Sequence, residues 1–372
     1  MNRAITRQSI AAAAVVLAAP AVVPLGIAPA AGEESASPAV RGWTVALDRS
    51  AVSRKGQQVK GRPTFETVGV TWSGGDDPQV EVRTRVDGVW SRWQDADQLV
   101  GGRSAATEPL WVGTSDAVRV RVAEWRRALA VVMVDPGEQP EQPEEETAPR
   151  TARMAAATTT ATATDRRRLR HAPMPRLRLR SDWGANERMR TSDPVYLDRI
   201  KQVHVHHTAG KNRYSRDEVP GILRSMYWYH TKQLGWSDLG YNFLVDRFGR
   251  IWVGRAGGYR KRVRGAHTLG FNHASFGVAA IGDYDKARGN ERLKGALTRL
   301  VAWKLDRDGR APAGRVRIYS KGSDLFPKGT RLKLPAVVSH RRTNQTACPG
   351  RNLYDFVPRL RERAQARADR WG

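Results

Sequence analysis

The residues best suited to chemistry are a group of histidines and a single cysteine. His204, His206 and His207 close the stretch IKQVHVHH, where the two-residue period of a strand puts the first two on one face and His207 on the other. His340 closes a second apolar stretch, LPAVVSH, and Cys348 follows it in a loop. Imidazole and thiolate are the ligands that zinc prefers, and three protein ligands leave a fourth position for water or substrate. Two strand-end histidines and the cysteine could therefore bind zinc, but core histidines beside a buried free cysteine would explain the same spacing equally well.

Cys348 is the only cysteine among 372 residues, so it has no partner for an internal disulfide. A second interpretation makes it a nucleophile with His340 as its base. Nucleophilic cysteines usually sit at a helix N-terminus, where the dipole lowers the thiol pKa. Here Pro349, Gly350 and a polar loop are expected before any helix, which disfavours this interpretation.

The elements that must position these residues are predicted by hydrophobic periodicity within 176–372. IKQVHVHH indicates a buried strand, and SRDEVPGILRSMYWYHTKQLG indicates a helix that begins at a capping box of Ser215 and Glu218 and ends at Gly235. Strands mixed with helices of this length indicate an α/β domain around a mostly central sheet. The other predicted elements are a hairpin over YNFLVDRFGRIWVG, a strand over SFGVAAIGDY, a helix over ERLKGALTRLVAWKLDRDG and a last helix within 353–370.

Residues 41–135 are patterned as short strands. QVEVRTRV alternates valine or threonine with charged residues, and Asp87-Gly88 then supplies a tight hairpin turn. Such strands predict a small all-β, sandwich-like module. Its tryptophans could form a sugar-stacking surface, although core packing is the more common use of most of them; they are Trp72, Trp90, Trp93, Trp111 and Trp125.

A linker is predicted between the two units, over 136–175, because GEQPEQPEEETAP and TARMAAATTTATATD cannot bury a core. RRRLRHAPMPRLRLR follows, with seven arginines between Arg166 and Arg180. This arginine tract could hold the protein to anionic wall polymers, or it could be a solvated tail, and the composition does not separate the two. Its last part, RLRLR, alternates leucine with arginine and could already be an edge strand.

The first residues have the pattern of a secretory signal peptide, predicted over 1–31. Arg3 and Arg7 precede an alanine-rich apolar run, and Ala28-Pro29-Ala30 resembles a cleavage site. A membrane anchor is the alternative, but the prolines and the weak hydrophobicity of alanine argue against a spanning helix. No later stretch is long and apolar enough to span a membrane. We therefore expect a secreted or cell-wall protein with no transmembrane segment after cleavage.

The chain carries 63 Lys and Arg against 37 Asp and Glu, a net charge of +26. A charge of this size favours a polyanionic partner, and outside the cell anionic wall polymers or a membrane surface are the expected ones. A nucleic-acid partner is not expected, because no recognised binding module or aromatic-interleaved basic motif occurs. GRAGGYR is glycine-rich but lacks G-x-G-x-x-G spacing, so a nucleotide site is not expected either.

Four ordered motifs resemble those of one known family. VHHTAG, HTKQLGWSDLGYNFLVDRFGRIWVGR, GAHTLGFNHASFGVAAIGDY and SHRRTNQTACPG are similar to the series found in peptidoglycan recognition proteins and the related zinc-dependent N-acetylmuramoyl-L-alanine amidases, and RSDWGA resembles the family's entry motif. The resemblance covers nearly all of 176–372 and implies a central mixed β-sheet flanked by helices. Residues 41–135 resemble, more weakly, an N-terminal region of secreted actinobacterial members to which no clear function is attached.

The resemblance implies a zinc site and its catalytic neighbours. His206, His340 and Cys348 match the zinc ligands, and Tyr241 matches a residue whose hydroxyl lies close to the reacting carbonyl. Thr346 matches a position where phage relatives carry a lysine, so a fixed positive charge is missing from the oxyanion region. The implied reaction is hydrolysis of the amide between N-acetylmuramic acid and L-alanine of the peptidoglycan stem peptide. No glutamate stands out near the motifs as a general base.

Three further residues match positions that contact the muropeptide: His230, His267 and Trp236. Each could instead be a packed core or helix-face residue. The alternative function is a recognition protein that binds peptidoglycan without cutting it. Family members of that kind typically lack the cysteine ligand, so its presence here favours an enzyme. A monomer is expected.

Overall fold

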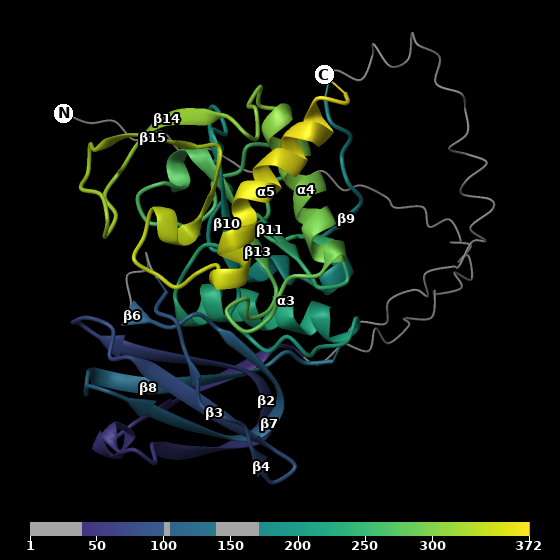
Figure 1. Ribbon diagram of the computed structural model, residues 1–372. Helices are drawn as coiled ribbons and strands as arrows, with labels where there is room; N and C mark the ends of the chain where they lie inside the picture. The colour runs from purple at the N-terminus through teal and green to yellow at the C-terminus, as the bar shows by residue number, and fades with distance from the viewer. Residues whose placement is uncertain (1–38, 100–104, 139–170, 372) are drawn as a thin grey trace, which may run out of the picture. The chain divides into compact units, whose positions relative to one another are not determined.

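The computed structural model describes residues 39–99, 105–138 and 171–371, which form two β-sheets, three α-helices and a two-stranded ribbon (Figure 1). The predicted signal peptide and most of the predicted linker lie outside the described residues. Within the described part of the chain, none of the helices has the length and apolarity needed to cross a bilayer.

The first sheet is antiparallel and forms an all-β module, as the alternation predicted. In the third strand, the Val80 and Val82 side chains are buried, and the Asp87-Gly88 turn takes positive φ at both residues, as the predicted tight hairpin requires. The strand order is β1-β8-β2-β7-β3-β4, with β5 paired to β3 and β6 to β2. The strands are β1 (Arg41–Ala46), β2 (Gln57–Ser73), β3 (Val80–Val86), β4 (Val89–Trp90), β5 (Gln94–Asp95), β6 (Ala105–Ala106), β7 (Leu110–Val122) and β8 (Arg127–Asp135).

The module's tryptophans divide between core and surface. Trp72 and Trp111 are buried, as core packing predicts. Trp90 and Trp93 are half-buried, with the guanidinium of Arg83 over both rings at 5.2 and 4.8 Å from the centroids. At these two positions the rings stack with arginine, and nothing in these contacts identifies a sugar-binding surface.

The second sheet has six strands in the order β16-β10-β13-β11-β12-β9. Its centre is parallel, and only the β11–β12 hairpin is antiparallel, so the predicted α/β class is confirmed as a mixed sheet. The strand predicted over RLRLR is present as the edge strand β9. The strands are β9 (Leu177–Arg178), β10 (Gln202–His207), β11 (Phe243–Val245), β12 (Ile251–Val253), β13 (Ser275–Ala280) and β16 (Val337–Ser339), and β14 (Arg315–Tyr319) pairs with β15 (Arg331–Pro335) as a separate ribbon.

Helices cover both faces of the second sheet (Figure 1). One face packs Val203 and Val205 of β10 against α4 and α5, and the opposite face packs Leu244 and Ala279 against α3. Side chains alternate along a strand, so His204 and His206 belong to the α3 face. The helices are α3 (Glu218–Trp228), α4 (Glu291–Asp306) and α5 (Arg351–Ala368), and the short turns are η1 (Arg49–Val52), η2 (Ser181–Trp183), η3 (Glu187–Met189), the π-turn η4 (Tyr229–Gln233), η5 (Asn272–Ala274) and η6 (His340–Arg342).

Helix α3 begins where the sequence predicts, and the π-turn η4 completes the stretch that the sequence predicts as one helix. The Glu218 amide donates to Ser215 Oγ at 3.2 Å, and the Ser215 amide donates to a Glu218 carboxylate oxygen at 2.5 Å, which is a complete capping box. After Trp228 the helix widens into the π-turn η4, and Gly235 ends it with φ +66°. The π-turn itself has no signal in the hydrophobic pattern.

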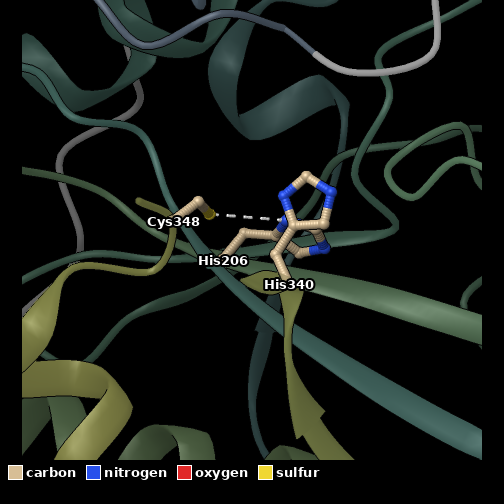
Figure 2. Close-up of side chains that lie close together, drawn as sticks. All are labelled: His206, His340 and Cys348. Carbon is tan, nitrogen blue, oxygen red and sulfur yellow. Dashed lines mark hydrogen bonds between the residues drawn. The ribbon is translucent and has the colours of Figure 1, made fainter. Parts of the chain in front are cut away.

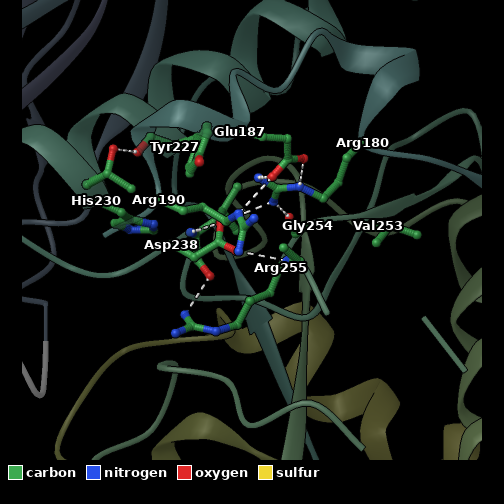
Figure 3. A network of polar contacts seen from close by, with 12 residues as sticks. Arg180, Glu187, Arg190, Tyr227, His230, Asp238, Val253, Gly254 and Arg255 are labelled. Atoms are coloured by element: carbon green, nitrogen blue, oxygen red, sulfur yellow. Dashed lines mark hydrogen bonds and ion pairs between the residues drawn. The ribbon is translucent and has the colours of Figure 1, made fainter. Parts of the chain in front are cut away.

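Arg180 belongs to a buried network, although it is the last residue of the predicted arginine tract. Figure 3 shows it between Glu187 and Asp238. Its Nε donates to Glu187 at 2.6 Å and its Nη1 donates to Asp238 at 3.1 Å and to the Gly254 carbonyl. Asp238 in turn accepts the Ala256 amide at 2.8 Å. Arg180 therefore fixes the start of the second domain to the β12 region and does not serve as a surface charge.

The module and the α/β domain pack together along α3 and η4. Trp111 of β7 lies in the same apolar cluster as α3 residues such as Ile222 and Met226. The Tyr229 hydroxyl donates to the Thr107 carbonyl of the module at 3.1 Å. Leu99, Val132 and Val134 of the module cluster with Tyr229 and Leu234 of the domain. These contacts place the module on the α3 side of the second sheet, which is the side to which His206 belongs.

Candidate metal and catalytic site

The site lies at the carboxyl ends of two parallel strands. Val205 of β10 is opposite Ser339 of β16, so the next residue of each strand, His206 and His340, emerges at the same edge of the sheet. Cys348 approaches from the loop that leads into α5. Open α/β sheets bind ligands at this edge, because side chains and loops from several strands meet there.

The three predicted metal ligands lie together (Figure 2). One ligand atom from each of His206, His340 and Cys348 lies within 4.8 Å of the other two. The His206 Nδ1 is 3.7 Å from the Cys348 Sγ, and the His206 and His340 ring centroids are 4.5 Å apart. All three side chains are buried.

The polar atoms of this set fit a metal ion better than they fit one another. Both ring nitrogens of His340 are buried without a hydrogen-bond partner among the described residues. Burial and neighbouring histidines hold the pKa of His206 well below its ordinary value, and burial lowers the pKa of His340 to about 4, so both rings are neutral and can coordinate. Buried polar groups are normally paired, so the unpaired nitrogens of His340 fit a role as metal ligands. Two imidazoles and a thiolate match the donor set of zinc.

His267 contacts the ring nitrogen of His206 that does not face Cys348. The His206 Nε2 lies 3.1 Å from the His267 Nδ1, which leaves the His206 Nδ1 facing Cys348. The His267 ring occupies space that a side chain at position 277 would take, because a Cβ on Gly277 would meet it at 2.4 Å. Metal-binding histidines are commonly oriented in this way by an outer partner. His267, which the resemblance predicts as a substrate contact, is therefore buried and contacts the candidate metal ligand His206.

His204 and His207 flank the ligand set in different ways. His204 lies 3.0 Å from Gln202 Oε1. The backbone amide of His207 donates to Cys348 Sγ at 3.4 Å, and its ring Nδ1 accepts the Tyr284 amide at 3.2 Å. A donated amide stabilises a thiolate, so His207 supports the cysteine through its backbone.

The arrangement does not support Cys348 as a nucleophile. Burial raises the pKa of its thiol well above the ordinary value, and the neighbouring amide offsets this only in part. His340 makes no hydrogen bond to it among the described contacts. The sequence-based expectation of a polar loop before the next helix is wrong, because α5 begins at Arg351, directly after Pro349 and Gly350.

Tyr241 borders the metal set. Its ring centroid is 5.2 Å from that of His206, and its side chain is buried. The hydroxyl donates to Glu108 Oε1 at 3.2 Å, and Glu108 belongs to the N-terminal module. Burial and the Glu108 charge hold the pKa of Tyr241 well above its ordinary value, so the phenol keeps its proton and remains a donor.

Thr346 lies where the metal set meets a large cleft. Its Oγ1 accepts the Cys348 amide at 3.1 Å, and its side chain is half-buried. The cleft has a volume of about 1360 Å³ and is lined by Thr346 and Ala347 from the α/β domain and, among others, by Asp97 and Arg121 from the module. Asp97 Oδ2 is also 3.5 Å from His207 Nε2. The cleft thus reaches the residues that adjoin the candidate ligands.

His230 and Trp236 stack on each other, and the His230 ring centroid lies 6.2 Å from that of Tyr241. Their ring centroids are 4.6 Å apart and the rings are tilted by 20°. His230 is only 1% exposed, and its Nδ1 accepts the Gly240 amide at 3.2 Å. Burial lowers its pKa to about 3. These contacts are those of a packed pair at the end of η4, and substrate contact at either residue stays a prediction.

Sequence reasoning missed two acidic residues, Glu108 and Asp97. Both come from the β-rich module, and no motif spacing connects them to the histidines. The only available signal was negative, since the motifs of the α/β domain contain no evident general base.

Comparison with known proteins finds one family model that matches each part of the chain. Residues 196–351 match the family model described as N-acetylmuramoyl-L-alanine amidase. Residues 24–162 match a model described as an N-terminal galactose-binding domain-like region.

Individual relatives cover the C-terminal half. Peptidoglycan-recognition protein SC2 of Drosophila melanogaster is 28% identical over 178 residues, which are 48% of this chain and 82% of that protein. The human N-acetylmuramoyl-L-alanine amidase is 35% identical over 135 residues, or 36% of this chain and 19% of that protein. The solved structure of Drosophila PGRP-LB is 26% identical and covers 49% of this chain and 92% of its own, with a TM-score of 0.39.

Proposed function

Because its C-terminal domain belongs to the family of peptidoglycan recognition proteins and N-acetylmuramoyl-L-alanine amidases, we propose that the chain hydrolyses the amide between N-acetylmuramic acid and L-alanine of peptidoglycan stem peptides, with zinc as cofactor. The observation that carries this proposal is the buried group of His206, His340 and Cys348, in which His340 has no protein partner for either ring nitrogen among the described residues.

The protein residues have separate tasks in this proposal. His206 through Nδ1, His340 and Cys348 hold the metal, and His267 orients the His206 ring. When bound, zinc lowers the pKa of a coordinated water to near neutral and polarises the substrate carbonyl. Coordination would also protect the lone thiol from oxidation in the oxidising compartment that the predicted signal peptide implies.

Tyr241 and Thr346 are the proposed donors to the oxygen that gains charge in the transition state. The Tyr241 phenol keeps its proton and lies beside His206. One such donor typically lowers the barrier by roughly 3 kcal/mol. Thr346 is neutral, so this site would work without the fixed positive charge that phage relatives carry.

The substrate also sets where the protein would work. Peptidoglycan lies outside the cytoplasmic membrane, so the predicted signal peptide and a secreted or cell-wall location agree with this function. The net charge of +26 favours a wall rich in anionic polymers and stem-peptide carboxylates. Part of the arginine tract remains a candidate contact with those polymers, without Arg180.

The alternative is a recognition protein that binds muropeptides without cutting them. Many members of the family whose sequence identity to this chain is similarly low bind peptidoglycan without cutting it. The complete set of two histidines and one cysteine, together with Tyr241, favours an enzyme.

The proposal is tested by digesting purified peptidoglycan with the mature protein and counting new L-alanine amino termini. The same digestion is repeated after chelation and after zinc is added back. We expect release that disappears with the metal and returns with it. Tight binding to peptidoglycan with no new amino termini under any metal condition would support the recognition protein and overturn the amidase.

A further inference from the structure

The Glu108 carboxylate reaches the candidate site from a different module. Glu108 lies between β6 and β7, and its Oε1 accepts the Tyr241 hydroxyl at 3.2 Å. Its position is fixed by the backbone, because the Glu108 amide donates to the Asp97 carbonyl at 2.8 Å. The preceding residue, Thr107, bonds to Val70 on its own module and accepts the Tyr229 hydroxyl from the α/β domain. The module therefore holds Glu108 in place from both sides.

The surroundings of Glu108 are unusual for a structural carboxylate. No cation pairs with it among the described ion pairs, although the chain carries an excess of 26 positive charges. Among the described residues, the titratable groups that interact electrostatically with it are Tyr241, Asp97, Tyr229 and Cys348, and none of these four is a cation. Glu108 is half-buried, so its carboxylate loses part of its hydration without gaining a cationic partner among the described residues, and residues of this kind concentrate at functional sites.

The protonation of Glu108 agrees with a role in proton transfer. Desolvation raises its pKa to about 8, and the nearby Asp97 charge acts in the same direction. A bound dication at the neighbouring ligand set would favour the ionised form and lower this value. A carboxyl whose pKa lies near the working pH can both accept and return a proton.

We propose that the N-terminal module completes the amidase site and that Glu108 is its proton-transfer residue, a role that rests on the proposed amidase function. In hydrolysis the water oxygen bonds to the carbonyl carbon, and one water proton passes to a Glu108 carboxylate oxygen. The same proton then passes to the amide nitrogen as the carbon–nitrogen bond breaks. The products are the lactyl carboxylic acid of the muramic acid and the free amine of L-alanine, so atoms and charge balance. In the chain without substrate the Tyr241 hydroxyl donates to this carboxylate and places it beside the site, and the hydroxyl turns to the oxyanion once substrate is bound.

The first test compares the zinc-loaded full-length protein with Glu108→Gln, which keeps an oxygen acceptor for Tyr241 but cannot accept the proton. General acid–base catalysis is typically worth 10²–10⁴-fold, so we expect kcat to fall by at least about 100-fold. KM, zinc content and melting temperature should stay close to those of wild type. Glu66→Gln is the matched control, because Glu66 is a half-buried carboxylate of the same module that accepts a hydroxyl, from Thr114 at 2.9 Å, in a different cleft.

The outcomes separate the two proposals. Wild-type protein without cleavage overturns the proposed function and, with it, the role of Glu108. Cleavage by wild type together with an undiminished kcat in Glu108→Gln overturns only the role of Glu108. A higher kcat in this variant would also overturn it and would make Glu108 a blocking group. If Glu108→Gln fails to fold, Glu108→Asp withdraws the carboxylate by one methylene, and an unchanged kcat there contradicts the proposal.

A second readout does not depend on activity. Infrared difference spectra of the metal-free protein, wild type minus Glu108→Gln, should contain a protonated carboxyl band that disappears as the pH rises through about 8. The same band should disappear at lower pH in the zinc-loaded protein. A spectrum without this band at neutral pH in the metal-free protein would overturn the assignment.

Discussion

At the scale of single residues, the loop cysteine is explained by what surrounds it. Cys348 is buried beside His206 Nδ1 and receives a backbone amide from His207. We expect Cys348→Ser to lose zinc and with it all cleavage, because a neutral hydroxyl is a poor zinc ligand. Metal analysis after dialysis checks this. His273→Gln removes a histidine outside the ligand set and should retain wild-type zinc, and equal zinc in Cys348→Ser would exclude the cysteine as a ligand.

Tyr241 and Thr346 can be ranked as donors by removing one hydroxyl at a time. Tyr241→Phe should retain zinc and KM but lower kcat by roughly 10²–10³-fold, as expected for a lost oxyanion donor. Thr346→Val should have a smaller effect, because its oxygen already accepts the Cys348 amide. Steady-state kinetics on a soluble muropeptide measures both. A larger loss in Thr346→Val would reverse the assignment of the main donor.

The site residues differ in how visible they are in the sequence. His206, His340 and Cys348 could be found because strand periodicity and familiar motifs mark them. Glu108 could not be found, because its role depends on which module lies against Tyr241, and no local pattern encodes that contact. His267 was found by its motif, but its contact with His206 Nε2 depends on the pairing of distant strands.

At the scale of elements, features formed by neighbouring residues could be predicted from the sequence, whereas features that depend on long-range pairing could not. The capping box at Ser215 and the Asp87-Gly88 turn are formed by neighbouring residues, so a short stretch of sequence predicts them. The order of the parallel strands and the ribbon of β14 and β15 depend on long-range pairing that hydrophobic period does not report. The π-turn η4 likewise follows from packing, since it places the Tyr229 ring against the module.

Close packing between β2 and η4 gives a test of the module contact. A Cβ on Gly69 would meet the Tyr229 ring at 2.4 Å, so Gly69→Ala should lower the free energy of unfolding by about 1–3 kcal/mol, as overpacking usually does. Urea unfolding measures this change. Gly295→Ala is the control in the middle of α4, where alanine should stabilise by up to about 1 kcal/mol. An unchanged stability in Gly69→Ala would mean that β2 and η4 do not pack as described.

At the scale of the whole molecule, the buried histidines make the fold sensitive to acid. Burial lowers the pKa of His204 and of His230 to about 3, below the ordinary value of 6.5. Between these values the unfolded chain binds protons that the folded chain does not, so the free energy of unfolding falls as the pH falls. Glu108 has the opposite effect on the free energy of unfolding. Its pKa is raised in the folded chain, so its contribution favours the fold at low pH and is lost as the pH rises through about 8.

A single variant isolates one of these contributions. Each unit of pH in this window is worth about 1.4 kcal/mol per histidine. In the metal-free protein, His230→Asn keeps an acceptor for the Gly240 amide. Between pH 6.5 and 4.5 it should therefore lose about 2–3 kcal/mol less stability than wild type. Urea unfolding at the two pH values measures the difference, in which the Glu108 contribution cancels. Equal losses in the two proteins would contradict a neutral, buried His230.

Glu108 belongs to one module and contacts the candidate site of the other, and this also limits how such a chain can be rearranged by recombination. If one module supplies the proton-transfer residue and the other supplies the metal ligands, neither module contains a complete site by itself. Exchanging the β-rich module for that of a relative would preserve activity only when the donor brings an acid to the same place and a surface that accepts Tyr229. Chimeras built from this chain should therefore be cut outside the pair, so that both units are inherited together.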